Sequence, residues 1–267
     1  MWVQYKRSNP LTNDLMTKNM RRAVVVTPTY DERETIADLI DAVLAEQDRV
    51  DAFELYVLVA DSHSQDGTLS IVDGLAAQNP RVHLLDVHER GIGIGLFRGF
   101  QYAIDDLGAD VLIEMDADFQ HNPGDIPHFL QKIGEGYDVV VGSRFVDGSV
   151  NEMPLHRKAL SVGANQVVRS ALGLKNVTEI TTSYRAFTSE TFLKVDPDSV
   201  PWQEKSFIFV PVFLVRMLET GASATEIPMT MHPRVRGYSK MIYWRYMRDI
   251  LSFSLKSRLG ISSKHAG

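Results

Sequence analysis

Two aspartates, Asp116 and Asp118, stand one residue apart directly after the apolar segment Val111–Met115. Two carboxylates so close to each other repel unless a cation or hydrogen-bond donors compensate their charge. Their hard oxygen atoms favour Mg²⁺ or Mn²⁺, ions that take few protein ligands and share the rest with substrate phosphates. The alternative is that both residues cap a helix beginning near Pro123, and the Asp-x-Asp spacing alone does not decide between the two.

A second acidic stretch, Pro28-Thr-Tyr-Asp-Glu-Arg-Glu34, follows an earlier apolar run. Tyr30 could stack on a nucleobase while neighbouring backbone groups hydrogen-bond that base. Asp31 and Glu34 also form an Asp-x-x-Glu version of the helix capping box, and we favour capping over a ligand role for these two residues. Asp61 ends the next apolar run, where doubly wound folds often place an acidic residue that binds ribose hydroxyls.

Six basic residues stand at predicted strand ends or in loops instead of on helix surfaces. Because a planar guanidinium pairs with two phosphate oxygens at once, several of them could converge on an anionic substrate. Taken singly, each is more simply a solvated surface charge. The six are Arg144, Arg157, Arg185, Arg234, Arg236 and Lys240.

The elements that must position these residues alternate between strands and helices. Short runs rich in β-branched residues suit strands buried on both faces, and apolar residues between them recur at the helical spacing. Ligands bind parallel sheets at the carboxyl ends of the strands, which is where the acidic residues fall. We therefore predict an α/β fold with a mostly parallel, helix-flanked sheet. Its strands are expected at 23–26, 55–60, 82–85, 111–115 and 139–141, and its helices at 36–44, 68–78, 96–107 and 126–133.

The second half of the chain predicts a helix at 160–171, a strand near 184–187 and a helix near 207–218. No Ser/Gly-rich or low-complexity stretch divides the chain. We predict a polar leader at 1–22, one continuous domain at 23–240, and an amphipathic helix with a tail at 241–267. That last helix could lie at a bilayer interface or dock against the core, and its pattern leaves both open.

Composition excludes several classes of function. The net charge of −6 argues against a general nucleic-acid binder, because phosphate backbones are held by an excess of Lys and Arg. The absence of cysteine excludes disulfides and a thiolate nucleophile. No signal peptide and no membrane-spanning window is expected. The run Gly91-Ile-Gly-Ile-Gly95 with Gly99 never gives Gly-x-Gly-x-x-Gly, so we reject a dinucleotide fingerprint and expect close packing against a ligand or a neighbouring strand.

Taken in order, these motifs resemble the inverting family-2 glycosyltransferases of the GT-A fold, and most closely the dolichol-phosphate (polyprenol-phosphate) mannose synthase group. Val25-Val-Thr-Pro-Thr-Tyr-Asp-Glu-Arg-Glu34 is similar to the family's opening Pro-Thr-Tyr-Asn-Glu-x-Glu. Met115-Asp-Ala-Asp-Phe-Gln-His-Asn-Pro123 is similar to its metal motif Met-Asp-Ala-Asp-x-x-His-x-Pro, and Val141-Gly-Ser-Arg144 to the Gly-Ser-Arg that follows. The resemblance covers roughly Val24 to Lys240 and implies the GT-A nucleotide-diphospho-sugar transferase fold.

Three later segments also resemble family motifs, namely Arg157 to Asn165, Thr182-Ser-Tyr-Arg-Ala-Phe187 and Arg234-Val-Arg-Gly-Tyr-Ser-Lys240. Two positions depart from the pattern. The family's second aspartate after strand two is Ser62 here, and Phe207-Ile-Phe-Val-Pro-Val212 holds no acid where the group usually has Gln-x-Glu.

The resemblance implies a division of roles among these residues. A nucleotide-sugar would be bound by Pro28, Tyr30, Glu32, Asp61, Asp116 and Gln120. A divalent ion, Mg²⁺ or Mn²⁺, would be held by Asp116, Asp118 and Gln120. The catalytic residues would be Asp118, Arg144, Arg234 and Lys240. The acceptor phosphate would be bound by Arg144, Arg157 and Arg185.

The implied reaction moves mannose or another hexose, with inversion, from a GDP- or UDP-sugar to a polyprenyl phosphate. A phosphate acceptor is already anionic near neutral pH, so a dedicated general base is less necessary. We expect a cytoplasmic enzyme, peripheral at the membrane, that meets the membrane surface or a membrane-anchored partner. Two alternatives stay open: a family-2 enzyme that acts on a sugar or protein hydroxyl, and a nucleotide-binding scaffold without catalysis.

Overall fold

The structure is a computed structural model that describes residues 20–153, 155–172, 174, 177–203, 207–232 and 243–258. Some side chains within the helices of the last third are left out of that description, and Arg157 is one of them. Statements about the structure below concern the described residues.

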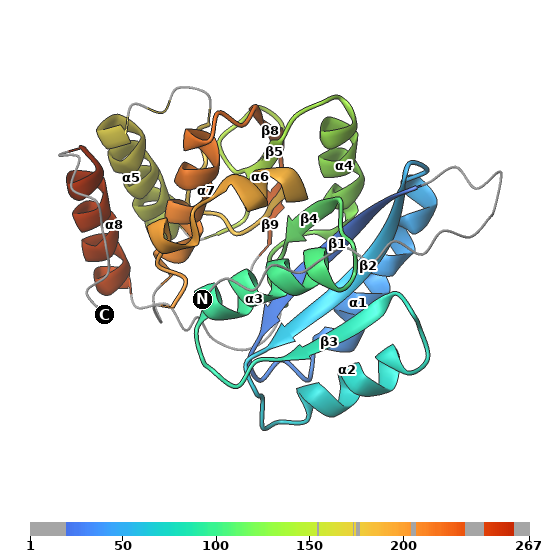
Figure 1. The fold of residues 1–267 in the computed structure, drawn as a ribbon. Coiled ribbons are helices and arrows are strands. Elements are labelled where there is room, and N and C mark those ends of the chain that lie inside the picture. Colours follow the sequence, from blue (N-terminus) through green and yellow to red (C-terminus); the bar gives the residue numbers. More distant parts are fainter. Residues whose placement is uncertain are drawn as a thin grey trace.

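Seven strands form one sheet in the order β3-β2-β1-β4-β7-β5-β8 (Figure 1). All neighbours are parallel except β7, which is antiparallel to both β4 and β5. The five strands predicted in the first half are confirmed. The strands are β1 (Arg21–Thr29), β2 (Phe53–Asp61), β3 (Val82–Asp86), β4 (Val111–Glu114), β5 (Val139–Ser143), β7 (Arg185–Thr188) and β8 (Ala224–Pro228). A separate parallel pair consists of β6 (Val150–Asn151) and β9 (Thr230–Met231).

Helices cover the sheet, and each predicted helix is present with shifted ends. The α-helices are α1 (Ile36–Ala45), α2 (Thr68–Ala76), α3 (Ile92–Asp105), α4 (Ile126–Gly134), α5 (Leu155–Leu172), α6 (Ser189–Lys194), α7 (Phe209–Glu219) and α8 (Tyr243–Arg258). Short 3-10 turns occur at η1 (Glu46–Arg49), η2 (Pro123–Asp125) and η3 (Pro197–Ser199). None of the described helices is long and apolar enough to cross a membrane.

Both faces of the sheet are buried, as the β-branched runs predicted. Successive residues of a strand point to opposite faces. On β1, Val24 joins a hydrophobic cluster that contains Phe100 of α3 and Phe213 of α7. The next residue, Val25, joins a second cluster that contains Leu39 of α1. The sheet therefore lies between two helical layers.

Helix α3 approaches the sheet closely because it is rich in glycine. A Cβ atom added at Gly99 would lie 2.6 Å from Val26 Cγ1 and 3.3 Å from Ala60 Cβ. A Cβ atom at Gly93 would lie 2.8 Å from the carbonyl oxygen of Trp202. The expectation of close packing against a neighbouring strand is confirmed at Gly99, which faces β1 and β2, whereas packing against a ligand stays a prediction.

The predicted capping box of Asp31 and Glu34 is wrong. Helix α1 begins at Ile36, and its N-cap residue, Thr35, makes no side-chain capping hydrogen bond. Asp31 instead adopts a left-handed conformation, with φ at 53°, and its Oδ1 accepts a hydrogen bond from the backbone N–H of Gln65 at 3.1 Å. Asp31 thus links the end of β1 to the loop after β2, and the chain turns once more before α1 begins at Ile36.

Helices α5 and α8 pack against each other at the side of the fold remote from β3 (Figure 1). Tyr246 and Ile250 of α8 are buried in the core cluster. Leu251 and Leu255, on the same helix, are 50% and 61% exposed. The predicted C-terminal helix thus docks against the core and still carries apolar side chains on its outer side. The proposed boundaries at 22/23 and 240/241 stay predictions.

Candidate functional site

The loop after β4 carries the two aspartates that the sequence singled out. Asp118 is buried, and its Oδ1 accepts a hydrogen bond from the backbone N–H of Gln120 at 3.0 Å. Asp116 is half-buried, and its Oδ2 accepts a hydrogen bond from Ser183 Oγ at 2.9 Å. A carboxylate offers about four lone-pair sites, so a hydrogen bond to it does not by itself preclude coordination of a hard cation.

The helix-capping alternative for these aspartates is wrong, because Asn122 fills that position. Its side chain accepts a hydrogen bond from the backbone N–H of Gly124 at 3.0 Å, at the start of η2. The backbone N–H of Asp116 donates instead to Nδ1 of His121 at 3.2 Å. His121 is buried and stacks on Tyr184, with ring centroids 4.7 Å apart. Burial lowers the pKa of His121 to about 4, so near pH 7 the imidazole is neutral and Nδ1 can accept.

Gln120 joins this loop to the end of β9. Its backbone carbonyl accepts a hydrogen bond from the N–H of His232 at 3.2 Å, and its Nε2 donates to the carbonyl of His232 at 3.4 Å. A role in the metal site would therefore fall to Oε1 of Gln120. His232 is the last residue described before the gap at 233–242, and Arg234 follows two residues later in the sequence. The segment that leads to Arg234 and Lys240 thus starts beside the aspartate loop.

Asp61 fastens the ends of β1 and β2 to each other. It is fully buried, and its Oδ2 accepts hydrogen bonds from Thr29 Oγ1 and Ser64 Oγ, each at 2.7 Å. Its Oδ1 accepts a third from the backbone N–H of Ser64 at 2.7 Å. Asp61 therefore stabilises the loop beside Pro28, and its direct contact with a nucleotide stays a prediction.

Tyr30 faces a basic residue that the sequence did not single out. The guanidinium carbon of Arg90, in the loop after β3, lies 4.0 Å from the centroid of the Tyr30 ring, and Arg90 Nη2 donates to the Tyr30 hydroxyl. A guanidinium over an aromatic face is held by the quadrupole of the ring. Glu32 is half-buried nearby, and its backbone N–H donates to Thr68 Oγ1 at 3.1 Å. The aromatic platform predicted for a base is thus already stacked on a cation.

Three side chains of metal-binding type lie together at the end of β3 and on the loops after β2 and β3. Nδ1 of His63 lies 3.0 Å from Oδ1 of Asp86, and Nε2 of His88 lies 3.9 Å from its Oδ2. All three residues are exposed. This cluster was not predicted and includes neither of the aspartates after β4. Its two imidazoles suit Zn²⁺ better than the hard ions Mg²⁺ and Mn²⁺.

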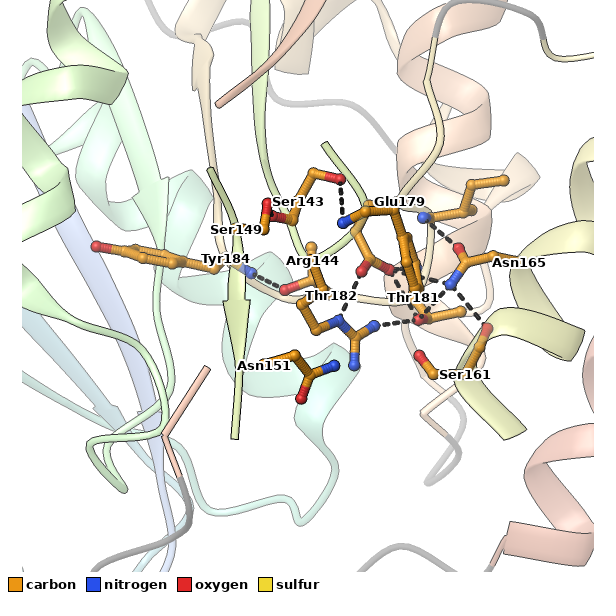
Figure 2. A network of polar contacts seen from close by, with 12 residues as sticks. Ser143, Arg144, Ser149, Asn151, Ser161, Asn165, Glu179, Thr181, Thr182 and Tyr184 are labelled. Carbon is orange, nitrogen blue, oxygen red and sulfur yellow. Dashed lines mark hydrogen bonds and ion pairs between the residues drawn. The ribbon is translucent and has the colours of Figure 1, made fainter. Parts of the chain in front are cut away.

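Arg144, which follows β5, is held in a network of polar contacts (Figure 2). Its Nε donates to Oε2 of Glu179 at 2.6 Å, and its Nη2 donates to Thr181 Oγ1 at 2.8 Å. The Glu179 side chain is fully buried, whereas that of Arg144 is 12% exposed. The network therefore anchors the guanidinium from the inside while part of the Arg144 side chain reaches the surface.

The acceptor-phosphate role predicted for Arg185 is wrong in this structure. Arg185 is fully buried on β7, and its Nε donates to Oε2 of Glu114 on β4 at 2.6 Å. Its Nη1 donates to the carbonyl of Val210 on α7 at 2.9 Å. The guanidinium is enclosed between sheet and helix, so it cannot reach an external phosphate. Burial raises the pKa of Glu114 to about 7, and the charge of Arg185 acts in the opposite direction.

The remaining predicted basic residues fall outside what the structure describes. Arg157 lies on α5, where its side chain is not described, and Arg234 and Lys240 fall in the gap at 233–242. Their roles stay predictions.

Residues 24–192 match the family described as Glycosyl transferase family 2. The chain belongs to this family. It is 35% identical over 224 residues to the polyprenol monophosphomannose synthase of Mycolicibacterium smegmatis, a match that covers 83% of this chain and 81% of that protein. It is 36% identical over 226 residues to the undecaprenyl-phosphate mannosyltransferase of Micrococcus luteus, covering 82% and 87%.

A solved structure confirms the fold of this family-2 glycosyltransferase. Glucosyl-3-phosphoglycerate synthase from Mycobacterium tuberculosis, in complex with Mn²⁺, uridine diphosphate and phosphoglyceric acid, superposes with a TM-score of 0.63. The match covers 92% of this chain and 81% of that one at 19% identity. At this identity the likeness shows the fold alone, and it agrees with the predicted GT-A architecture.

The sequence missed the residues that hold the named side chains in place. Glu179 and Arg90 carry no distinctive spacing, and Ser183 lay within the quoted motif Thr182-Ser-Tyr-Arg-Ala-Phe187 without any sign that it contacts Asp116. His121 lay within a motif that was quoted, yet nothing in the spacing indicated that its Nδ1 accepts from the backbone of Asp116. For Arg90, the available signal was a basic residue in the loop that follows a predicted strand.

Proposed function

We propose that this family-2 glycosyltransferase moves a hexose, mannose by analogy with its relatives, from a nucleotide-diphospho-sugar to a polyprenyl phosphate. The names of the two relatives at 35% and 36% identity support both the sugar and the acceptor class. Whether the donor nucleotide is GDP or UDP is left to the experiment below.

One observation carries the proposal for the site: a single short segment holds both the acidic and the basic side chains. Ser183 Oγ donates to Asp116 Oδ2, and two residues earlier Thr181 Oγ1 accepts from Arg144 Nη2. A carboxylate pair and an arginine held by one short segment suit two neighbouring phosphate groups, one on the donor and one on the acceptor.

In the proposed reaction an acceptor phosphate oxygen attacks the anomeric carbon of the donor sugar. The bond between that carbon and the diphosphate oxygen breaks, the nucleoside diphosphate leaves with the electron pair, and the configuration inverts. Arg144 binds and orients the attacking phosphate. No proton needs to be removed, because the phosphate is already ionised near neutral pH, and so the absence of an acid in Phe207–Val212 is tolerated.

The loop after β4 fits a divalent ion. Asp116 and Asp118 offer hard oxygen atoms, and the loop backbone is fixed by His121, so the ligands need little reorganisation. An ion bound there would neutralise charge on the departing diphosphate. The fold neighbour that holds Mn²⁺ with uridine diphosphate is consistent with this assignment. We assign the diphosphate-bridging ion to these aspartates and not to the exposed cluster at His63.

The proposal includes contact with a membrane surface, because the lipid acceptor resides there. The paired helices α5 and α8 each expose two large apolar side chains. Leu155 and Val162 of α5 are 80% and 52% exposed, and Leu251 and Leu255 of α8 are 50% and 61% exposed. Apolar groups on helices beside a lipid-binding site can enter the headgroup region. The enzyme would then work at the cytoplasmic face without crossing the bilayer.

A donor screen tests the function directly. The protein is incubated with Mg²⁺, undecaprenyl phosphate in detergent and labelled GDP-mannose, UDP-glucose or UDP-N-acetylglucosamine, and label is counted after organic extraction. Label from one donor in the organic phase supports the proposal and identifies the donor. Label transferred to a water-soluble product indicates a hydroxyl acceptor, and no transfer from any donor indicates a non-catalytic scaffold.

The metal assignment has its own control. We expect Asp118→Ala, or excess EDTA with the unaltered protein, to reduce transfer by at least a hundredfold while the far-UV circular dichroism spectrum is unchanged. Full activity of that variant, or full activity in EDTA, would exclude the role proposed for this loop.

A further inference from the structure

The buried carboxylate of Glu179 lies directly behind Arg144 and uses both of its oxygens (Figure 2). Oε2 accepts from Arg144 Nε at 2.6 Å. Oε1 accepts from the backbone N–H of Thr181 at 3.0 Å, from Thr181 Oγ1 at 2.9 Å and from Asn165 Nδ2 at 3.3 Å. A buried charge is tolerated only when it is paired and hydrogen-bonded in this way.

The backbone around Glu179 is itself fixed from two sides. Glu226 of β8 accepts hydrogen bonds from the backbone N–H groups of Thr178 at 2.9 Å and of Glu179 at 2.8 Å. On the other side, Asn165 of α5 accepts from the backbone N–H of Ile180 at 2.6 Å. Sheet and helix therefore both hold the segment that presents the Glu179 carboxylate, so that carboxylate is a rigid support.

A rigid support restricts how Arg144 can turn. Its guanidinium is planar, and two of its nitrogens, Nε and Nη2, are bound to Glu179 and to Thr181. Fixing two nitrogens of a planar group fixes the plane and the direction of the whole group. A bidentate arginine–phosphate pair depends on that direction, and pre-organisation removes the entropy cost of finding it.

We propose that Glu179 is a positioning residue for the acceptor phosphate, acting through Arg144. This inference rests on the proposed function, in which Arg144 binds that phosphate. Glu179 is buried behind the guanidinium, so it touches no substrate itself. Removing the Glu179 carboxylate should therefore weaken binding of the acceptor phosphate and leave binding of the donor unchanged.

The test compares Glu179→Gln with a matched control, Glu226→Gln, in steady-state kinetics with undecaprenyl phosphate and the donor active in the screen. Both substitutions remove one carboxylate charge from the same neighbourhood, but Glu226 is half-buried and accepts its hydrogen bonds from Thr178 and from the backbone N–H of Glu179. We expect Glu179→Gln to raise the acceptor KM on the order of tenfold, as loss of a charge-assisted hydrogen bond should, with the donor KM within about twofold. Because Glu226 acts on Arg144 only through the backbone that carries Glu179, we expect Glu226→Gln to raise the acceptor KM clearly less than Glu179→Gln does, with the donor KM within about twofold. Equal effects of the two variants on acceptor and donor would indicate a purely structural role and overturn the inference.

A double-mutant cycle with Arg144→Gln separates this inference from the proposed function. If Glu179 acts through Arg144, adding Glu179→Gln to Arg144→Gln raises the acceptor KM no further. Effects that multiply in the double variant overturn the positioning role and leave the role of Arg144 intact. If Arg144→Gln alone leaves the acceptor KM unchanged, the phosphate-binding role of Arg144 fails and the inference fails with it. Should Glu179→Gln not fold, Thr181→Val carries the same test, because Thr181 Oγ1 contacts both Arg144 and Glu179.

Discussion

The ion pair between Arg185 and Glu114 offers a test of the revised role of Arg185. Both side chains are fully buried, with 0% of the surface of each accessible to solvent. Removing one partner of a buried pair leaves an uncompensated charge and costs about 3–5 kcal/mol. Arg185→Met also loses the hydrogen bond to the carbonyl of Val210. We therefore expect the free energy of unfolding to fall by about 4 kcal/mol at pH 8.

The same loss should be smaller at lower pH. Burial already raises the pKa of Glu114 to about 7, and removal of Arg185 raises it further. A carboxyl whose pKa is raised in the folded state destabilises the fold at any pH above its unfolded pKa of 4.5, and this penalty shrinks as the pH falls toward 4.5. Urea unfolding of Arg185→Met at pH 6 and pH 8 measures the difference, and the variant should be the more stable relative to the parent at pH 6.

The double variant Glu114→Leu/Arg185→Met should recover most of the lost stability. Within the described part of the chain, Glu114 Oε1 and Arg185 Nη2 are buried without a hydrogen-bond partner, so the pair is imperfectly satisfied. Apolar replacement of such a pair is often neutral. Because neither residue reaches the surface, we expect this variant to keep the acceptor KM of the parent. A folded double variant whose acceptor KM rises tenfold would refute the reasoning and restore Arg185 as a phosphate ligand.

Three further predictions concern the loop after β4, the turn beyond it and the outer helices. Ser183→Ala removes the hydrogen bond to Asp116, and we expect the Mn²⁺ concentration for half-maximal activity to rise severalfold with little change in thermal stability. Asp125 is buried, and burial raises its pKa from 3.8 to about 6, so its ionisation destabilises the folded state at pH 8 and not at pH 3.5. We therefore expect Asp125→Asn to raise the free energy of unfolding by about 1–2 kcal/mol at pH 8 and to leave it unchanged at pH 3.5, as measured by thermal unfolding. Leu251→Glu/Leu255→Glu should reduce co-sedimentation with anionic vesicles at least fivefold while activity in detergent is retained; unchanged sedimentation would count against α8 as the membrane contact.

The sheet could be predicted from the sequence because each strand of the first half is a local pattern. The run at Val24 is apolar and β-branched on both faces, and such a run identifies a strand covered by two helical layers without any knowledge of its neighbours. The position of β7 could not be predicted in this way. It comes from the second half of the chain and lies antiparallel between β4 and β5, a pairing determined by contacts distant in sequence.

The error at Arg185 has the same origin. Side chains two apart on a strand share a face, and Phe187 belongs to the buried cluster that also contains Phe213. Arg185 must therefore point into the core, where Glu114 on the neighbouring strand supplies its counter-charge. A basic residue beside a strand end looks the same in the sequence whether it faces solvent or the core. Only the register of β4 against β7 distinguishes the two, since it pairs Glu114 with Arg185 directly.

The aspartates after β4 could be identified from the sequence as candidate metal ligands, but the contacts that hold them in place could not. Asn122 takes the capping position, so Asp116 and Asp118 do not cap the helical turn that follows them. Ser183 then orients Asp116, and the same short segment presents Thr181 to Arg144. In the proposed reaction, donor and acceptor phosphates are therefore placed by one segment and not by two independent loops. A shift of that segment would disturb both substrates together, whereas a substitution at Glu179 disturbs only the acceptor, and this difference is what makes the positioning role measurable.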